Sequence, residues 1–234
     1  MWKFWRRLQT HNQRREALLK KAPEGPMRDY LSVPFPNPLV DFRKIVYTAL
    51  DFETTGLSPE NDELLSFGVV DMRTTAIELA TAHHELIIPE GEIPEESAVI
   101  HEILDDQVME EGISLEHAVQ LLLKRLAGKV LIAHYAKIEL GFLNAACQKL
   151  YNTEFVIPTV DTLFLGHRWI EQRNLYLQQS DLRLNSLRTR FTLPHYKAHN
   201  ALTDALSTVE LFLALTAQRT TERHVPVKEF LIKS

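Results

Sequence analysis

The chain has 234 residues, of which 45% are hydrophobic and 24% are charged, and its formal net charge is −5. These values fit one globular domain with extensions and exclude collagen-like, disordered and disulfide-rich proteins. The single cysteine, Cys147, cannot form an internal disulfide. No apolar run reaches the roughly 20 residues that span a bilayer, and the N-terminus lacks the apolar core of a secretory signal. We expect a cytoplasmic protein with no transmembrane segment.

The N-terminal arm has a charge of its own. Residues 1–30 carry a balance of +5, so the rest of the chain carries −10, and an acidic body that acts on polyanions needs metal ions or a local basic groove. Residues 1–22 predict a basic helix with Trp2, Trp5 and Leu8 on one face. Because this apolar stripe lapses after Leu8, docking on the domain or binding a protein partner is favoured over lying on a membrane surface. Residues 23–38 contain five prolines and predict a linker without regular helix or central strand.

From residue 41 onward the pattern alternates between strands and helices. An almost continuous apolar run at 45–52 predicts a buried strand. Strands at 64–71 and 78–89 follow after short connections, which favours a three-stranded antiparallel meander. Further strands are predicted at 130–133 and 159–163, and helices at 114–126, 137–151 and 200–217. The pattern predicts an α/β fold with a mixed sheet flanked by helices. We divide the chain into an arm and linker (1–40), a central domain (41–218) and a C-terminal tail (219–234).

Two carboxylates end the first predicted strand. Asp51 and Glu53 are two residues apart, so both lie on one face while Phe52 points to the other. Like charges at the end of a buried strand repel each other and lose hydration. Taken alone, the pair fits an acidic, solvated strand end as well as it fits two hard oxygen ligands for a divalent cation.

Glu139 favours the metal interpretation. On a helix it shares a face with apolar residues three, four, seven and eleven positions later, namely Phe142, Leu143, Ala146 and Leu150. A buried carboxylate needs a cation, a basic partner or a raised pKa. A favourable interaction with the helix dipole would explain its position in the first turn but not the inward face.

His199 and Asp204 form a third candidate site. Five helical residues would place them about 140° apart, so they do not share a helical face. Asn200 is a candidate N-cap, which puts His199 on the preceding loop and Asp204 in the first turn. A loop histidine can then reach over a metal site held by an aspartate on the helix.

Three segments resemble the motifs of the DnaQ-type, DEDDh-class 3′–5′ exonucleases. Residues 50–57 (LDFETTGL) resemble the first motif, residues 131–139 (LIAHYAKIE) the second, and residues 199–205 (HNALTDA) the third. The segments VDTL at 160–163 and NSL at 185–187 resemble family segments between the last two motifs. The resemblance covers residues 45–216, and three motifs in the right order make it specific.

The resemblance implies a ribonuclease H-like three-layer fold and hydrolysis of the terminal phosphodiester at a 3′ end, with release of nucleoside monophosphates. It also implies two Mg²⁺ or Mn²⁺ ions, held by Asp51, Glu53, Glu139 and Asp204. Asp51 would bridge both ions, and Glu53 and Asp204 would help to hold the ion that binds the attacking water. His199 would act as general base toward that water.

The resemblance also places substrate contacts and shows one departure. Thr54 and Leu57 would line the terminal nucleotide, and His101 would lie close to its base. The second motif has Tyr135, Ile138 and Glu139 where the family usually has Asn, Phe and Asp. The extra methylene of Glu139 moves its carboxylate by about 1.5 Å, which Mg²⁺ tolerates poorly. We therefore predict reduced activity or a preference for Mn²⁺ over Mg²⁺.

Outside the motifs, we expect His134 to pack or hydrogen-bond and Asp161 to cap local backbone. The sequence thus predicts an exonuclease domain at 41–218 that trims single-stranded or frayed 3′ ends, which suits proofreading or end trimming. We expect DNA as the substrate and keep RNA open, because 2′-OH recognition depends on pocket details that motifs do not fix. The alternative is a catalytically weakened nuclease-like domain that binds nucleic acid or protein; Glu139 and the basic arm motivate it.

Overall fold

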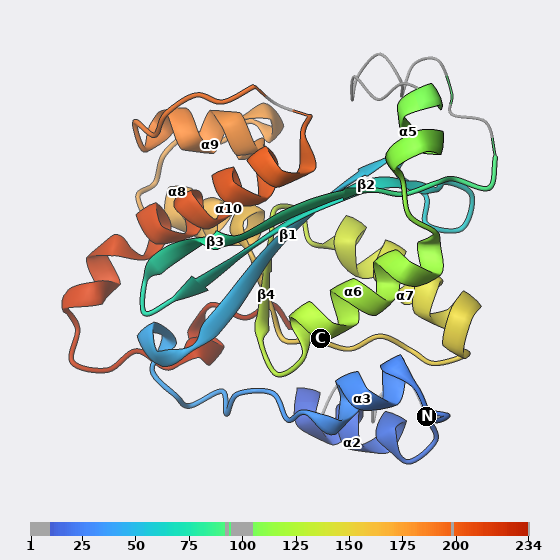
Figure 1. Cartoon of the computed structure of the whole chain (residues 1–234). Helices are drawn as coiled ribbons and strands as arrows, with labels where there is room; N and C mark the ends of the chain where they lie inside the picture. The colour runs from blue at the N-terminus through green and yellow to red at the C-terminus, as the bar shows by residue number, and fades with distance from the viewer. Residues whose placement is uncertain (1–9, 92–93, 95–104, 198, 234) are drawn as a thin grey trace.

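A mixed five-stranded sheet forms the centre of the protein (Figure 1). The computed structural model describes residues 10–91, 94, 105–197 and 199–233. The strand order is β3-β2-β1-β4-β5; β2 is antiparallel to β1 and β3, whereas β1, β4 and β5 are parallel. The strands are β1 (Val46–Thr54), β2 (Leu64–Arg73), β3 (Ala76–Leu86), β4 (Val130–Ala133) and β5 (Thr159–Asp161). The predicted meander followed by parallel strands is confirmed.

Helices cover both faces of this sheet, which gives three layers (Figure 1). Along β1, Leu50 and Phe52 belong to the core shared with one helix layer, and Tyr47 and Ala49 to the core shared with the other. The first layer contains α6 (Leu115–Leu126) and α7 (Lys137–Tyr151); the second contains α8 (Thr162–Glu171), α9 (Leu184–Arg190) and α10 (Ala201–Thr216). Because side chains alternate along a strand, the odd-numbered residues of β1 face the α10 layer.

Caps set the ends of several helices. The Ser114 side chain accepts a hydrogen bond from the backbone N–H of His117 before α6, and Asn200 caps α10 through Thr203. The strand expected at 159–163 ends at Asp161, so the last two residues of that prediction were wrong. Asp161 accepts from the N–H of Leu163 and thereby begins α8. A further helix, α5 (Asp105–Glu111), follows β3.

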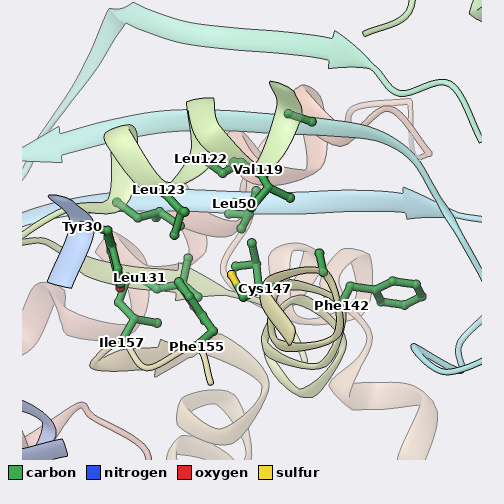
Figure 2. Packing of buried hydrophobic residues seen from close by; sticks show 14 of the residues in the cluster. Tyr30, Leu50, Val119, Leu122, Leu123, Leu131, Phe142, Cys147, Phe155 and Ile157 are labelled. Carbon is green, nitrogen blue, oxygen red and sulfur yellow. The ribbon is translucent and has the colours of Figure 1, made fainter. Parts of the chain in front are cut away.

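The described part of the N-terminal arm is docked on the domain. It forms α2 (His11–Leu19) and α3 (Pro26–Ser32), so the prediction of a linker without helix was wrong there. Pro26 occupies the first turn of α3, where a backbone N–H would lack an intrahelical partner in any case. Tyr30 on α3 stacks on Phe155 with ring centroids 5.5 Å apart and belongs to the same core cluster as buried Cys147 (Figure 2). Trp2, Trp5 and Leu8 lie outside the described residues.

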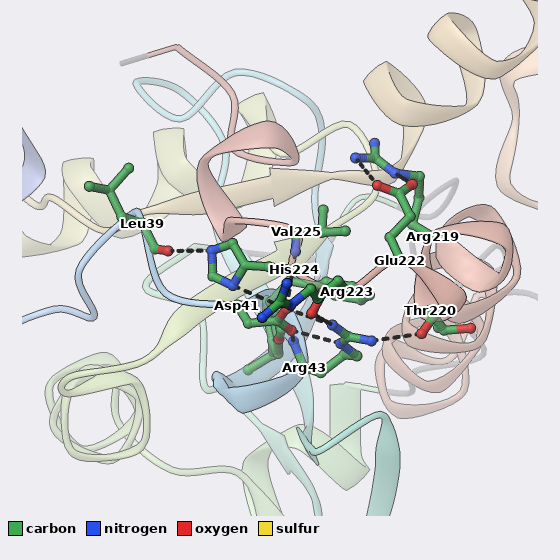
Figure 3. A network of polar contacts seen from close by, with 11 residues as sticks. Leu39, Asp41, Arg43, Arg219, Thr220, Glu222, Arg223, His224 and Val225 are labelled. Atoms are coloured by element: carbon green, nitrogen blue, oxygen red, sulfur yellow. Dashed lines mark hydrogen bonds and ion pairs between the residues drawn. The ribbon is translucent and has the colours of Figure 1, made fainter.

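The C-terminal segment also packs on the domain. Val225, Val227 and Phe230 are buried in the core on the α10 side of the sheet. Asp41 accepts hydrogen bonds from Arg43 and from the backbone N–H of Val225 (Figure 3). The short 3₁₀ helices are η1 (Phe42–Lys44), η2 (Gln179–Leu182), η3 (Ala217–Thr221) and η4 (Val227–Glu229). The domain boundaries at 40/41 and 218/219 stay predictions.

Within the described ranges, no helix is long and apolar enough to cross a membrane.

Candidate active site

Three carboxylates meet where β1 ends under the first turn of α10. Asp51, Glu53 and Asp204 each offer a carboxylate oxygen, and these atoms all lie within 4.8 Å of one another. The spacing along β1 puts Asp51 and Glu53 on the α10 face, as the alternation of strand side chains requires. Asn200 caps α10 and so fixes the turn that carries Asp204. We call Asp51, Glu53 and Asp204 the acid trio.

Gly68, which the sequence motifs did not single out, allows this close approach. It pairs with Asp51 across β1 and β2. A Cβ atom at this position would lie 2.1 Å from the backbone nitrogen of Leu202, which is closer than any real contact. The start of α10 therefore rests directly on the backbone of β2. A glycine inside an apolar strand pattern is the signal that would have indicated such an approach.

The electrostatics of the acid trio favour a bound cation. Burial raises the pKa of Asp51, and the negative charges of Glu139, Glu53 and Asp204 raise it further. Burial likewise raises the pKa of Asp204, although the hydrogen bond from His199 opposes this. Among the described residues, no ion pair with lysine, arginine or histidine involves Asp51, Asp204 or Glu139. All the donors are carboxylate oxygens, which suit a hard divalent cation such as Mg²⁺ or Mn²⁺.

Glu139 lies beside the acid trio but does not join it. It is 3% exposed in the first turn of α7, and its inward face, predicted from the sequence, is confirmed by the burial of Phe142, Leu143 and Ala146. Its Oε2 atom is buried without a hydrogen-bond partner among the described residues. Burial, with a contribution from the charge of Asp161, raises the pKa of Glu139 to about 8. The structure thus brings three of the four predicted acids together and adds the fourth from the opposite helix layer.

Asp161 holds the start of α7, the helix that carries Glu139. Its two carboxylate oxygens accept hydrogen bonds from the backbone N–H groups of Tyr135 and Ala136, each at 3.1 Å. His134 Nδ1 lies 2.9 Å from the Thr162 hydroxyl. Both contacts agree with the structural roles expected for Asp161 and His134. They fix the loop between β4 and α7 and so the position from which the Glu139 side chain extends.

His199 lies on the loop before α10, as the N-cap at Asn200 predicts. Its side chain is exposed, its backbone has a left-handed φ of 66°, and its N–H donates to Asp204 Oδ2 at 2.9 Å. Thr54 is buried and donates its hydroxyl hydrogen to the Gly56 carbonyl, whereas Leu57 is 74% exposed. His101 lies outside the described residues.

Comparisons with known proteins agree with this geometry. The profile of the exonuclease family RNase_T matches residues 48–212. DNA polymerase III subunit epsilon of Treponema pallidum is 30% identical over 173 residues, which cover 74% of this chain and 77% of that protein. DNA polymerase III PolC-type of Thermotoga petrophila is also 30% identical over 172 residues, but the match spans only 12% of its length.

Solved structures share the fold. The zinc-bound complex of Escherichia coli ExoI with single-stranded DNA superposes with a TM-score of 0.63 at 11% identity, covering 76% of this chain and 42% of that one. Cell-death related nuclease 4 superposes with a TM-score of 0.62 at 13% identity, covering 76% and 65%. These neighbours support the ribonuclease H-like architecture expected from the motifs. From the family profile and the epsilon relative together, we conclude that the chain belongs to the DnaQ-type 3′–5′ exonuclease family of the ribonuclease H-like superfamily.

Proposed function

We propose that this protein is a metal-dependent exonuclease that removes nucleotides from the 3′ ends of single-stranded or frayed DNA. The observation that carries the proposal is the acid trio, in which three carboxylates lie within 4.8 Å of one another. Such a cluster is unfavourable unless cations neutralise it. The same cluster is well suited to a reaction that builds negative charge on phosphate oxygens.

The residues at the site fit two divalent ions. Asp51, Glu53 and Asp204 would provide the shared ligands, and Glu139 would add its buried and unpartnered Oε2 atom from the side of α7. When bound, Mg²⁺ or Mn²⁺ would supply the positive charge that stabilises the attacking, bridging and non-bridging oxygens. The raised pKa values of Asp51 and Glu139 support this assignment, because bound cations would restore both carboxylates to their ionised forms.

The chain's own residues would handle the proton and the terminal nucleotide. His199, with an exposed side chain on the loop beside Asp204, would accept the proton of the attacking water as general base. Thr54 and Leu57 would line the terminal nucleotide next to Glu53. A duplex end has to unpair before its last nucleotide can enter such a site, which favours single-stranded and mismatched ends.

The choice of DNA rests on the relatives, which are named as a PolC-type DNA polymerase III, as the epsilon subunit of DNA polymerase III and as an exonuclease in complex with single-stranded DNA. RNA stays an alternative. A protein partner that binds through residues 1–22 is also a proposal, as is a cytoplasmic location.

The test is an end-labelled oligonucleotide assay with matched DNA and RNA strands. We expect the DNA to shorten from its 3′ end with Mg²⁺ or Mn²⁺, to stay intact in EDTA, and to stay intact with D51A. The D41N variant, altered at a buried aspartate outside the site, is the control and should cleave normally. Metal-dependent binding without shortening would reject the exonuclease and favour the alternative of a weakened nuclease-like binding domain.

A further inference from the structure

A buried arginine fastens the loop that presents His199. Arg188 on α9 is 1% exposed and is the largest fully buried side chain among the described residues. Its Nη1 donates to the Ser207 carbonyl on α10 at 2.7 Å, and its Nη2 donates to the Pro194 carbonyl in the loop at 2.7 Å. One guanidinium therefore joins three segments: α9, the loop at Pro194 and α10.

Tyr196 adds a second attachment to the same loop. The Arg188 guanidinium carbon lies 4.8 Å from the centroid of its ring. The Tyr196 hydroxyl donates to Glu210 Oε1 at 3.0 Å, while Glu210 Oε2 pairs with Arg188 Nη2 at 2.8 Å. We call Arg188, Tyr196 and Glu210 the Arg188 clasp. It holds the loop at residues 194 and 196, shortly before His199.

The Arg188 clasp is poorly explained as a device for stability alone. The Arg188 side chain is 1% exposed and that of Glu210 is 22% exposed, so burial of the guanidinium carries a desolvation cost that a well-packed apolar group avoids. The Nε atom of Arg188 is also buried without a hydrogen-bond partner among the described residues. The Arg188 clasp does provide a fixed geometry. The planar guanidinium of Arg188, the carboxylate of Glu210 and the backbone carbonyls form hydrogen bonds only within narrow ranges of direction.

This geometry matters at the end of the loop. His199 has a left-handed φ of 66°, an uncommon conformation for a residue with a side chain. Two contacts near it restrict the loop, namely the N–H bond from His199 to Asp204 Oδ2 and the Tyr196 hydroxyl bond to Glu210. Asp204 and Glu210 both belong to α10, so the clasp aligns the loop with the helix that carries a member of the acid trio.

We propose that Arg188, Tyr196 and Glu210 are positioning residues that hold the His199 imidazole in line with the acid trio. The proposal rests on the proposed function, because it assigns His199 a part in catalysis. None of the three residues belongs to the acid trio. They act on the rate by limiting where the base can be, and a misplacement of about 1 Å is enough to cost on the order of 100-fold in rate.

The first test separates turnover from binding. Y196F removes only the hydroxyl bond to Glu210 and keeps the ring on the guanidinium. In Y196F we expect kcat on a single-stranded DNA oligonucleotide to fall about 10-fold with KM unchanged, and we expect a larger fall in kcat in R188K. The conservative E210Q keeps an oxygen acceptor for Tyr196 and should fall less than E210A. Y176F is the matched control, since Tyr176 is 82% exposed, and it should behave as the unaltered protein.

The second test measures the loop directly, without substrate, and is compared with the kcat values of the first. Hydrogen exchange at the His199 backbone N–H should be faster in Y196F, while exchange in β1 and α7 should be unchanged. If exchange and kcat are both unchanged, the proposal is overturned. If the urea midpoint of unfolding falls while kcat and local exchange stay the same, the clasp is only structural and the proposal also fails. If the unaltered protein cleaves nothing, the proposed function fails, yet the exchange measurement still decides whether the clasp holds His199.

Discussion

Carboxylates in this protein occupy two opposite environments, one beside a cation from the chain and one beside other acids. Asp41 is 5% exposed and is met by the Arg43 guanidinium and the N–H of Val225, which hold its pKa well below the usual range (Figure 3). Half-buried Asp51 and buried Glu139 have acidic neighbours instead, and burial together with these negative charges raises the pKa of each. The chain itself supplies a guanidinium to Asp41. None of the described lysines or arginines pairs with Asp51 or Glu139, so we expect bound ions to supply the missing positive charge at the site.

Removing a charge should therefore have opposite effects in the two regions. D51N is expected to lower cleavage by more than about 100-fold, since it removes a shared metal ligand, and to raise the free energy of unfolding of the metal-free protein by relieving repulsion. D41N is expected to keep cleavage and to lower the free energy of unfolding, because the amide loses the charge that pairs with Arg43 and keeps only one of the two oxygens that accept from Arg43 and Val225. Oligonucleotide cleavage and urea unfolding in EDTA measure both effects. A D51N protein that is less stable than the unaltered one in EDTA would contradict the comparison.

Gly68 offers a way to break the acid trio without touching a charge. An added Cβ would lie 2.1 Å from Leu202 N and 2.2 Å from the Ala201 carbonyl carbon, both backbone atoms that cannot rotate away. We expect G68A to shift the start of α10, to lower cleavage by about 10- to 100-fold and to cost about 1–3 kcal/mol of stability. In the matched control G91A, the new Cβ would meet only a Glu63 side-chain oxygen at 3.4 Å. Equal activity of G68A and G91A would show that the α10 contact is adjustable.

Local periodicity explains why much of the site was predictable. The spacing of Asp51 and Glu53 along a strand and the apolar face that Glu139 shares with Phe142 follow from short repeats, and α7 has the predicted bounds. Contacts across long sequence separations carry no such repeat. The approach of α10 to Gly68 and the hydrogen bond from Arg188 to the Ser207 carbonyl on α10 depend on how the elements pack.

The N-terminal arm is a second region in which local sequence patterns were not enough to predict the structure. The proline count predicted a linker, but each proline acts only through its own φ and missing N–H. Pro26 begins α3 instead of preventing it, and the packing of Tyr30 on Phe155 stabilises the helix. The local sequence rules identified Pro26 as a residue that interrupts helices, but they did not show that it lies at the start of a helix, where it is tolerated.

The pH dependence of stability should separate the two regions. In the metal-free protein, the raised pKa of Glu139 means that stability is lost as the pH rises from about 4.5 to about 8, because the unfolded chain ionises first. The lowered pKa of Asp41 means that its contribution is present above about pH 4 and is lost as the pH falls through its folded value. We therefore expect the free energy of unfolding, measured with urea in EDTA, to fall less with rising pH in E139Q and to fall less with falling pH in D41N. The reverse assignment would contradict the pKa directions.

The smallest expected effect concerns the length of residue 139. Glu139 remains outside the acid trio, and an aspartate would shorten its reach by about 1.5 Å. Since Mg²⁺ demands near-octahedral geometry and Mn²⁺ is less strict, we expect E139D to raise Mg²⁺-supported turnover relative to Mn²⁺-supported turnover. E139Q, which keeps the length and loses the charge, is the control and should lower turnover with both metals. If E139D loses as much activity as E139Q, the pocket is built around the longer side chain, and the position of α7 has already adjusted to it.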